Sequence, residues 1–214
     1  MNEYHKIQTI WKRDERGRIL QGEWSLPEFE YLRCNKWEWT EKVDGTNVRV
    51  KWDGQAVTFC GKTDNAQMPT QLANHLVMTL RPLEGLFAET WPNNGNGDTP
   101  PPNVVLYGEG YGKGIQKGGV YTSDQRFVLF DVRVGQWWLR RLDVENVAAK
   151  LGLVVIPLCG RGTLLEMADC VQQGGPLSAW GGFQAEGIVA RPAIELCCRS
   201  GERLICKIKA RDFR

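Results

Sequence analysis

Lys42-Val43-Asp44-Gly45-Thr46-Asn47 decides the fold prediction for this chain. The stretch lies in a region, residues 38–60, with the composition of strand, turn and strand, and Asp53-Gly54 is a second turn signal. A lysine at the end of a strand, followed by an acid and a glycine in a tight turn, presents its amine at the mouth of a sheet. An amine is a nucleophile only when it is unprotonated, which nearby cations or desolvation favour. On its own, however, the motif indicates an ordinary hairpin with a surface lysine.

Strands and helices are expected around this stretch in an irregular order. The apolar spacing predicts helices over residues 66–90, broken at Pro82, and over 142–151 and 164–173, and the composition of residues 91–103 predicts a disordered loop. Strands are expected over residues 104–107, 126–134, 153–157, 187–190 and 203–209. Because strands and helices do not alternate regularly, we expect an α+β fold with largely antiparallel sheets, in a single domain over residues 1–214.

The composition fits a soluble globular protein. Hydrophobic residues make up 42% of the chain and charged residues 24%, which supports an ordinary core. The formal net charge of +2 does not by itself indicate a nucleic-acid partner, although a local basic groove is compatible with this total. The sequence has no signal peptide and no apolar run of membrane-spanning length, so we expect a cytoplasmic protein without a membrane partner. Seven cysteines without CxxC spacing predict reduced, mostly buried thiols and no zinc site.

A second lysine motif lies near the end of the sequence. Lys207-Ile208-Lys209 falls on a predicted strand, where alternate side chains share one face. Two ammonium groups on one face repel each other unless an anion lies between them, and a phosphate would suit. The pair is also typical of a solvated strand face, so it decides nothing alone.

Three carboxylates occupy similar positions beside apolar strands. Glu186 directly precedes the strand over residues 187–190, and Asp131 ends the apolar run that begins at Phe127. Glu109 is expected in a glycine-flanked turn, where a ligand can approach the backbone closely. The glycine spacing there is not GxGxxG, which excludes a dinucleotide-binding interpretation. Each motif is weak by itself, and their joint occurrence in this order is the informative observation.

Taken together, the motifs resemble those of the covalent nucleotidyltransferases, which comprise DNA ligases, RNA ligases and mRNA-capping enzymes. The likeness extends over about residues 36–210 and includes KxDG at 42–45, Lys62, Phe130-Asp131, Glu186-Gly187 and the KxK at 207–209. Within this superfamily the chain is most similar to type-2 ATP-dependent RNA ligases of phages and kinetoplastid editing systems. The run GEGYGKGIQK, residues 108–117, carries that distinction, because DNA ligases lack it. The resemblance implies the nucleotidyltransferase fold, with a nucleotide cleft between antiparallel sheets and flanking helices.

The resemblance also implies a reaction. Lys42 would attack the α-phosphorus of ATP, release pyrophosphate and carry AMP as a phosphoramidate. Lys207 and Lys209 would hold the α-phosphate and stabilise the charge that develops in the transition state. AMP would then pass to a 5′-phosphate end, and a 3′-hydroxyl end would displace it and seal the strand.

Five further residues would contact the nucleotide by the same resemblance. Phe130 would stack on adenine, Glu109 would contact the ribose, and Glu41 would contribute to adenine recognition. Lys62 stands where the family has an arginine that contacts phosphate, and Arg191 stands where it has a lysine. These two substitutions keep the charge but change the donor geometry.

A divalent cation is the second implied cofactor beside ATP. Glu186, with Glu109 and Asn47, would position a hydrated magnesium or manganese ion near the reacting amine. Asp131 matches an acid that the family uses in the later, strand-joining steps.

The expected partners are RNA ends or nicked duplexes, DNA-containing ones included. Only five residues follow Lys209, so we expect no C-terminal barrel or helical domain, and a protein partner could supply end recognition. A small DNA ligase or one of mixed specificity is the main alternative. A capping enzyme is disfavoured because Asn47 replaces the arginine usual there, and a non-catalytic nucleotide-binding remnant is disfavoured because the reactive lysines are retained.

Overall fold

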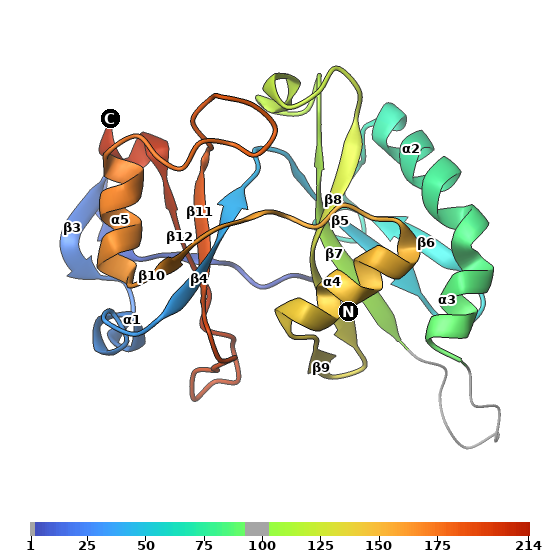
Figure 1. Ribbon diagram of the computed structural model, residues 1–214, viewed down its shortest axis with the longest axis horizontal. Helices are drawn as coiled ribbons and strands as arrows, with labels where there is room; N and C mark the ends of the chain where they lie inside the picture. The colour runs from blue at the N-terminus through green and yellow to red at the C-terminus, as the bar shows by residue number, and fades with distance from the viewer. Residues whose placement is uncertain (1–2, 93–102) are drawn as a thin grey trace. The chain divides into compact units, whose positions relative to one another are not determined.

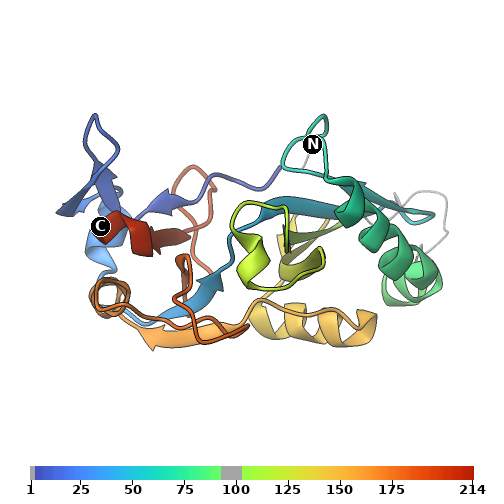
Figure 2. The ribbon, with the colours of Figure 1, turned by 90° about the horizontal axis from the view of Figure 1, so that it is seen from above.

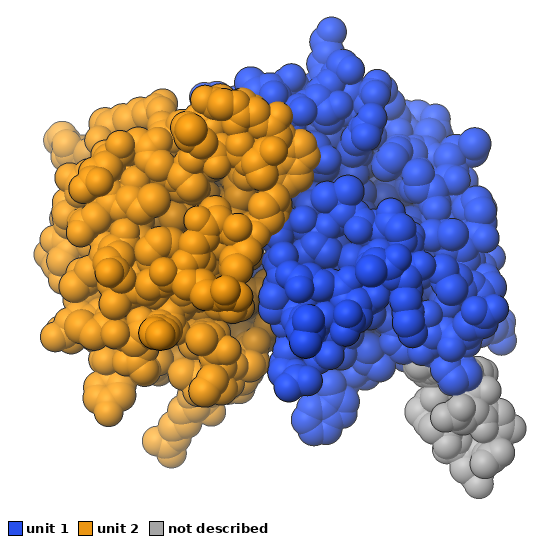
Figure 3. Space-filling model, viewed as in Figure 1, with its two compact units in different colours: residues 1–4, 44–156 blue, residues 5–43, 157–214 orange. Residues whose placement is uncertain are grey.

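The computed structural model describes residues 3–92 and 103–214, which fall into two compact units. Unit 1 comprises residues 1–4 and 44–156, and unit 2 comprises residues 5–43 and 157–214; Figure 3 colours them separately. The prediction of one domain is not tested by this division, since a single domain can contain two compact units.

Unit 1 is built on a five-stranded antiparallel sheet of order β6-β5-β7-β8-β9 (Figure 1). Its strands are β5 (Thr46–Trp52), β6 (Val57–Cys60), β7 (Val104–Tyr111), β8 (Arg126–Val134) and β9 (Trp137–Trp138). Its helices are α2 (Thr70–Leu80), the 3₁₀ turn η1 (Arg81–Leu83), α3 (Glu84–Thr90), the 3₁₀ turn η2 (Gly118–Val120) and α4 (Arg141–Leu151).

The two faces of this sheet differ in character. On one face, Val48, Val50 and Leu106 pack in a single core with α2, α3 and α4 (Figure 2). The approach is close enough that a Cβ on Gly110 would clash with the side chain of Leu72. Because successive side chains alternate along a strand, the neighbours of these residues lie on the opposite face, which carries Asn47, Arg49 and Glu109 beside the buried Val105 and Tyr107.

Unit 2 contains a second five-stranded sheet, of order β1-β12-β11-β4-β10, in which only the β1–β12 pair is parallel. Its strands are β1 (Gln8–Thr9), β4 (Trp37–Lys42), β10 (Leu158–Gly162), β11 (Gly187–Pro192) and β12 (Cys206–Lys209). The remaining elements are the hairpin of β2 (Trp11–Arg13) and β3 (Ile19–Trp24), the helices α1 (Pro27–Tyr31) and α5 (Leu164–Gln172), and the 3₁₀ turn η3 (Ala210–Phe213).

Helix α5 covers one face of the unit 2 sheet. A capping box starts it, since the Thr163 side chain accepts from the Glu166 backbone while the Glu166 carboxylate accepts from Thr163. The buried face of α5 packs with Trp37, Ile188 and Ile208 in one apolar core. Full burial of a side chain of this size stabilises the fold by about 1.5–3 kcal/mol. The sheet face opposite this core is therefore the one left for polar residues.

Most expected elements are confirmed. The strands flanking the KxDG stretch, the break at Pro82 and the helices at 142–151 and 164–173 are present, within one residue at the helix ends. Two strand predictions are wrong. Residues 153–157 form only an isolated bridge, between Leu129 and Val155, and the real strand follows at 158–162. The predicted strand over 203–209 is regular only from Cys206.

The environment of Glu109 also differs from the prediction. Glu109 lies inside β7, which continues through Gly108 and Gly110 to Tyr111, and not in a turn. The glycines serve close packing, because a Cβ on Gly108 would clash with Phe127 and the backbone of Val128. The loop predicted over 91–103 lies largely outside the described residues.

Two statements about environment complete the fold. Across residues 3–92 and 103–214, no helix has both the length and the apolar character needed to cross a bilayer. All seven thiols are free, but only Cys206 is fully buried, so the expectation of mostly buried cysteines is wrong.

Candidate active site

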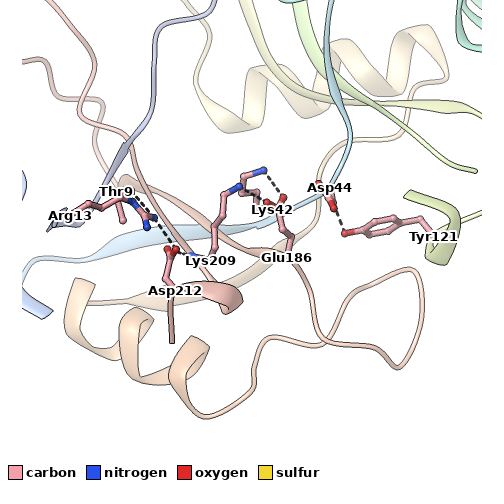
Figure 4. Close-up of polar contacts among 8 residues, drawn as sticks. All are labelled: Thr9, Arg13, Lys42, Asp44, Tyr121, Glu186, Lys209 and Asp212. Atoms are coloured by element: carbon pink, nitrogen blue, oxygen red, sulfur yellow. Dashed lines mark hydrogen bonds and ion pairs between the residues drawn. The ribbon is translucent and has the colours of Figure 1, made fainter. Parts of the chain in front are cut away.

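One carboxylate in unit 2 joins two lysines that lie far apart in the sequence. The Lys42 Nζ lies 2.6 Å from Glu186 Oε2, and the Lys209 Nζ lies 2.6 Å from Glu186 Oε1 (Figure 4). All three side chains are largely buried, at 14–21% exposure. The two ammonium groups would repel each other at this spacing, so the carboxylate between them is what holds the cluster together.

Strand register explains why these three residues meet. Gly187, the first residue of β11, pairs with Lys42 on β4 and with Lys209 on β12. Both lysines therefore lie in the same row as the residue that follows Glu186. A Cβ on Gly187 would clash with the backbone of Ile208 and Lys209, so the close pairing requires glycine there.

Lys207 belongs to the same face of β12 as Lys209. It pairs with Val189, one step further along the ladder. Burial, together with the neighbouring charges of Lys209 and Lys42, lowers the pKa of Lys207 to about 8, against the opposing effect of Glu186. The predicted same-face arrangement of the lysine pair is thus present, and the three cations form one electropositive surface.

A support behind Lys209 was not predicted from the sequence. The Asp212 carboxylate, on η3, accepts from the backbone N–H of Lys209 at 3.0 Å and pairs with Arg13 Nη2 at 2.8 Å (Figure 4). The side chain of Asp212 is only 2% exposed. Arg13 and Asp212 are separated by 199 positions in sequence, and no local pattern signals such a pair.

Glu41 and Arg191 lie in the same sheet but outside this cluster. Glu41 alternates with Lys42 along β4 and is 2% exposed on the core side, where its Oε2 accepts from the backbone N–H of Ala179 at 2.9 Å. Its Oε1 is buried and accepts from no residue that the structure describes. Arg191 lies on the same face of the sheet as Lys42. It is four positions after Gly187 on β11 and pairs with Glu38, so it lies away from the lysine cluster.

The face of the unit 1 sheet opposite its helices brings together two of the other predicted residues. Asn47 on β5 pairs directly with Glu109 on β7. Asn47 Oδ1 is buried and, within the described residues, has no hydrogen-bond partner. A buried oxygen of this kind fits a ligand or a bound water, since such atoms are rarely left unsatisfied.

Lys62 is exposed and follows β6, in a segment that a buried arginine fixes. Arg49 is 0% exposed; its Nε donates to the Gly61 carbonyl at 2.8 Å and its Nη2 pairs with Asp64 at 2.8 Å. Lys51 also pairs with Asp64, at 3.0 Å, and these two cations lower the pKa of that carboxyl, Lys51 contributing the larger part. The clamp spans residues 61–64, so it holds the backbone on both sides of Lys62. Sequence analysis missed Arg49, because an arginine in a strand signals nothing about its burial.

Phe130 and Asp131 lie at an irregularity in β8. The pairing of Asp131 with Tyr107 is followed by that of Leu129 with Gly108, so Phe130 is the extra residue of a β-bulge. Asp131 is 0% exposed and accepts a hydrogen bond from the Tyr4 hydroxyl. Phe130 is half-buried.

The turn after Lys42 has its own support in unit 1. The Asp44 backbone N–H donates to the Tyr121 hydroxyl at 3.2 Å (Figure 4). A Cβ on Gly45 would clash with the Gly110 carbonyl, which explains the glycine at this position. The run over residues 108–117 thus leads directly into a residue that anchors the KxDG turn.

The donors present fit a hydrated divalent cation better than a protein-enclosed metal. In the part of the chain that the structure describes, no group of three or more His, Cys, Asp or Glu side chains gathers to hold an ion. Asn47 and Glu109 offer oxygen atoms, which magnesium and manganese prefer. Because magnesium usually keeps several waters, two such donors suit it, and one of them, Asn47 Oδ1, is the unsatisfied oxygen.

Solved structures of an RNA ligase share this fold. A mutant of Naegleria gruberi RNA ligase with ATP and Mn matches at a TM-score of 0.63 and 19% identity, covering 87% of this chain and 53% of that chain. An apo mutant of the same ligase matches at 0.66 and 20%, covering 97% and 58%. The ligase with PPi matches at 0.66 and 17%, covering 98% and 62%. The chain therefore spans between half and two thirds of the length of these ligases.

The sequence comparison is more specific. The model of the RNA ligase family matches residues 35–209, which is most of the chain. This chain belongs to the RNA ligase family. No curated protein sequence matches it significantly.

Lys207→Met tests the electrostatic cost of the lysine surface. Below pH 8 both the folded and unfolded states carry the Lys207 proton, and the folded state bears the cost of the charge. Between pH 8 and 10.5 only the unfolded state keeps it, so wild-type stability should rise with pH. We expect Lys207→Met to be more stable than the wild type at pH 7. The difference between their free energies of unfolding, measured by urea denaturation, should become smaller between pH 8 and 10.5. Lys12→Met, at an exposed lysine, serves as control. A stability difference between Lys207→Met and the wild type that does not change with pH would contradict the prediction.

Arg49→Met tests the clamp on residues 61–64. Removing this buried partner should lower the free energy of unfolding by about 2–4 kcal/mol, because it leaves the Gly61 carbonyl and Asp64 without it. Lys51→Met removes the more exposed half of the same network and should cost less than about 1 kcal/mol. Urea denaturation measures both. Equal losses for the two variants would show that the buried guanidinium has no special role.

Proposed function

We propose that this protein is an ATP-dependent RNA ligase that carries AMP covalently on Lys42. The observation that carries the proposal is the contact of Glu186 with Lys42 and Lys209, each at 2.6 Å. The cluster provides a nucleophile, an acid–base partner and a cation for phosphate in one place. Family membership supports the same reaction class.

In the proposed first step, the Lys42 Nζ attacks the α-phosphorus of ATP. A nitrogen–phosphorus bond forms, the bond from the α-phosphorus to the bridging oxygen breaks, and pyrophosphate leaves with the electron pair. The amine must lose a proton, and Glu186 Oε2 is an acceptor within hydrogen-bond distance. Lys209 and Lys207 stabilise the negative charge on the transferring phosphoryl group.

Residues of unit 1 bind the nucleotide in this proposal. Glu109 contacts the ribose and Phe130 stacks on the adenine, while Lys62 contacts phosphate. When bound, a divalent cation would neutralise phosphate charge, and Asn47, Glu109 and Glu186 are the donors that would hold its waters.

Glu41 and Arg191 lie outside the lysine cluster, and their proposed contributions differ. The unsatisfied Glu41 Oε1 is an acceptor that suits the adenine amino group. Arg191 lies along the open face of β11, where its charge suits a phosphate of the nucleic-acid strand better than the α-phosphate.

The later steps use the stored AMP to join RNA ends. A 5′-phosphate oxygen attacks the phosphoramidate phosphorus, which frees Lys42 and leaves an adenylylated end. A 3′-hydroxyl then attacks the 5′-phosphorus, AMP leaves, and a phosphodiester bond remains. Asp131 serves this last part of the sequence rather than the first step.

Lys42→Ala tests the proposed nucleophile. Purified protein incubated with ATP labelled at the α-phosphate and with magnesium or manganese should gain an acid-labile, protein-bound label, and Lys42→Ala should reduce it to background. Lys42→Arg should also fail, because a guanidinium keeps the charge but is not deprotonated in proteins. Lys36→Ala, an exposed lysine just before β4, is the matched control and should label normally.

The same assay separates the competing activities. Labelling by ATP but not by GTP or NAD supports the proposal. Preferential labelling by GTP would indicate a capping enzyme, and label that survives loss of Lys42 would refute the assigned nucleophile.

Strand preference needs its own substrates. Nicked duplexes with ribose or deoxyribose on each side of the nick, together with single-stranded RNA ends, should be sealed best when the 3′-hydroxyl side is RNA. Faster sealing of all-DNA nicks would contradict an RNA ligase.

A further inference from the structure

Tyr4 touches both residues of the Phe130-Asp131 motif. Its hydroxyl donates to Asp131 Oδ2 at 2.8 Å, across 127 positions of sequence. Its ring meets the Phe130 ring at 5.1 Å between centroids, with an interplanar angle of 77°. One side chain therefore contacts an aromatic residue and an acid to which the proposed function assigns different steps.

The contact with Phe130 occurs where the strand itself gives little support. Phe130 is the bulged residue of β8, which the ladder with β7 leaves unpaired. Its side chain is consequently fixed by packing more than by strand geometry. Edge-to-face aromatic pairs prefer a defined orientation and stabilise it beyond the area they bury.

Tyr4 is itself held by two more aromatic rings. Its centroid lies 5.2 Å from that of Tyr107 and 5.6 Å from that of Trp138, and those two rings are 5.1 Å apart. Arg133 lies over the Trp138 ring at 5.6 Å. An aromatic cluster of Tyr4, Tyr107, Phe130 and Trp138 thus surrounds the bulge, and Tyr4 contributes its hydroxyl to the acid beside it.

The hydroxyl contact orients a buried carboxylate. Asp131 is 0% exposed, so water does not supply its hydrogen bonds freely. A donor to a buried carboxylate fixes its rotation and stabilises its charge. Loss of the hydroxyl would leave that oxygen without this donor while changing little in side-chain volume.

We propose that Tyr4 is a positioning residue with two separable actions, its ring holding Phe130 for the nucleotide and its hydroxyl holding Asp131 for sealing. The inference rests on the proposed function. Tyr4 forms no bond with substrate in this account. It acts through the two motif residues alone.

Tyr4→Phe and Tyr4→Leu divide the two actions. Tyr4→Phe keeps the ring, so self-adenylylation and the KM for ATP should stay within about twofold of wild type, while sealing of a 5′-adenylylated RNA should slow about tenfold. Tyr4→Leu removes the ring as well and should raise the KM for ATP about fivefold or more, with a smaller effect on kcat. Tyr31→Phe and Tyr31→Leu are the controls, since Tyr31 is 85% exposed in unit 2.

A double substitution tests whether the hydroxyl acts through Asp131. Tyr4→Phe in an Asp131→Asn background should cause no further loss of sealing. Full additivity of the two losses would overturn the hydroxyl part. This comparison remains informative if Tyr4→Leu folds poorly, because neither Tyr4→Phe nor Asp131→Asn removes a ring.

The remaining outcomes are also decisive. If Tyr4→Phe loses labelling and sealing in equal measure, or if a well-folded Tyr4→Leu keeps the wild-type KM, the inference fails. A wild-type protein that labels and seals while these patterns are absent refutes the role of Tyr4 alone. A wild-type protein that neither labels with ATP nor seals refutes the proposed function, and the role of Tyr4 falls with it.

Discussion

The attraction between the Glu186 carboxylate and two ammonium groups is the constraint on which the candidate site depends. Lys42 and Lys209 arrive on different strands and carry like charges, so without an anion between them the open face of this sheet would be unfavourable. At an effective dielectric constant of about 20, two unit charges 4 Å apart interact by about 4 kcal/mol. One carboxylate with an ion pair on each oxygen offsets such repulsion. It also leaves the lysines in place for a second anion to compete for them, which in the proposed function is the phosphate of a nucleotide.

Backbone packing makes that arrangement reproducible. Gly187 sits between the two lysine-bearing strands because no side chain could occupy its position, and Gly45 and Gly110 meet in the same manner where the chain turns after Lys42. Asp212 then fixes the backbone of Lys209 from behind. The charged groups of the candidate site are on long side chains, but the backbone positions of those side chains are fixed by glycines and by the buried Asp212.

Sequence reasoning succeeded where the information was local. Alternation along a strand placed Lys207 and Lys209 on one face, and a turn signal placed Lys42 at a strand end. It failed for Glu109, where closely spaced glycines were taken as a turn although they serve packing inside β7. It could not find Tyr4 or Arg13, because their partners lie more than a hundred positions away in the sequence. It could not find Arg49, because the sequence does not show that this arginine is buried. Family resemblance supplied the proposed roles, which physics alone would have left open.

The pairing of β1 with β12 has a consequence for how the protein is made. Gln8 pairs with Cys206, so one partner of this pair leaves the ribosome 198 residues after the other. The sheet of unit 2 must wait for its last strand, while residues 44–156 form a contiguous segment whose own sheet can assemble earlier. A nascent chain would thus contain Lys42 long before Lys207 and Lys209, the two cations proposed to act with it, have been added. The reactivity proposed for Lys42 would in this way be deferred until β12 has joined the sheet.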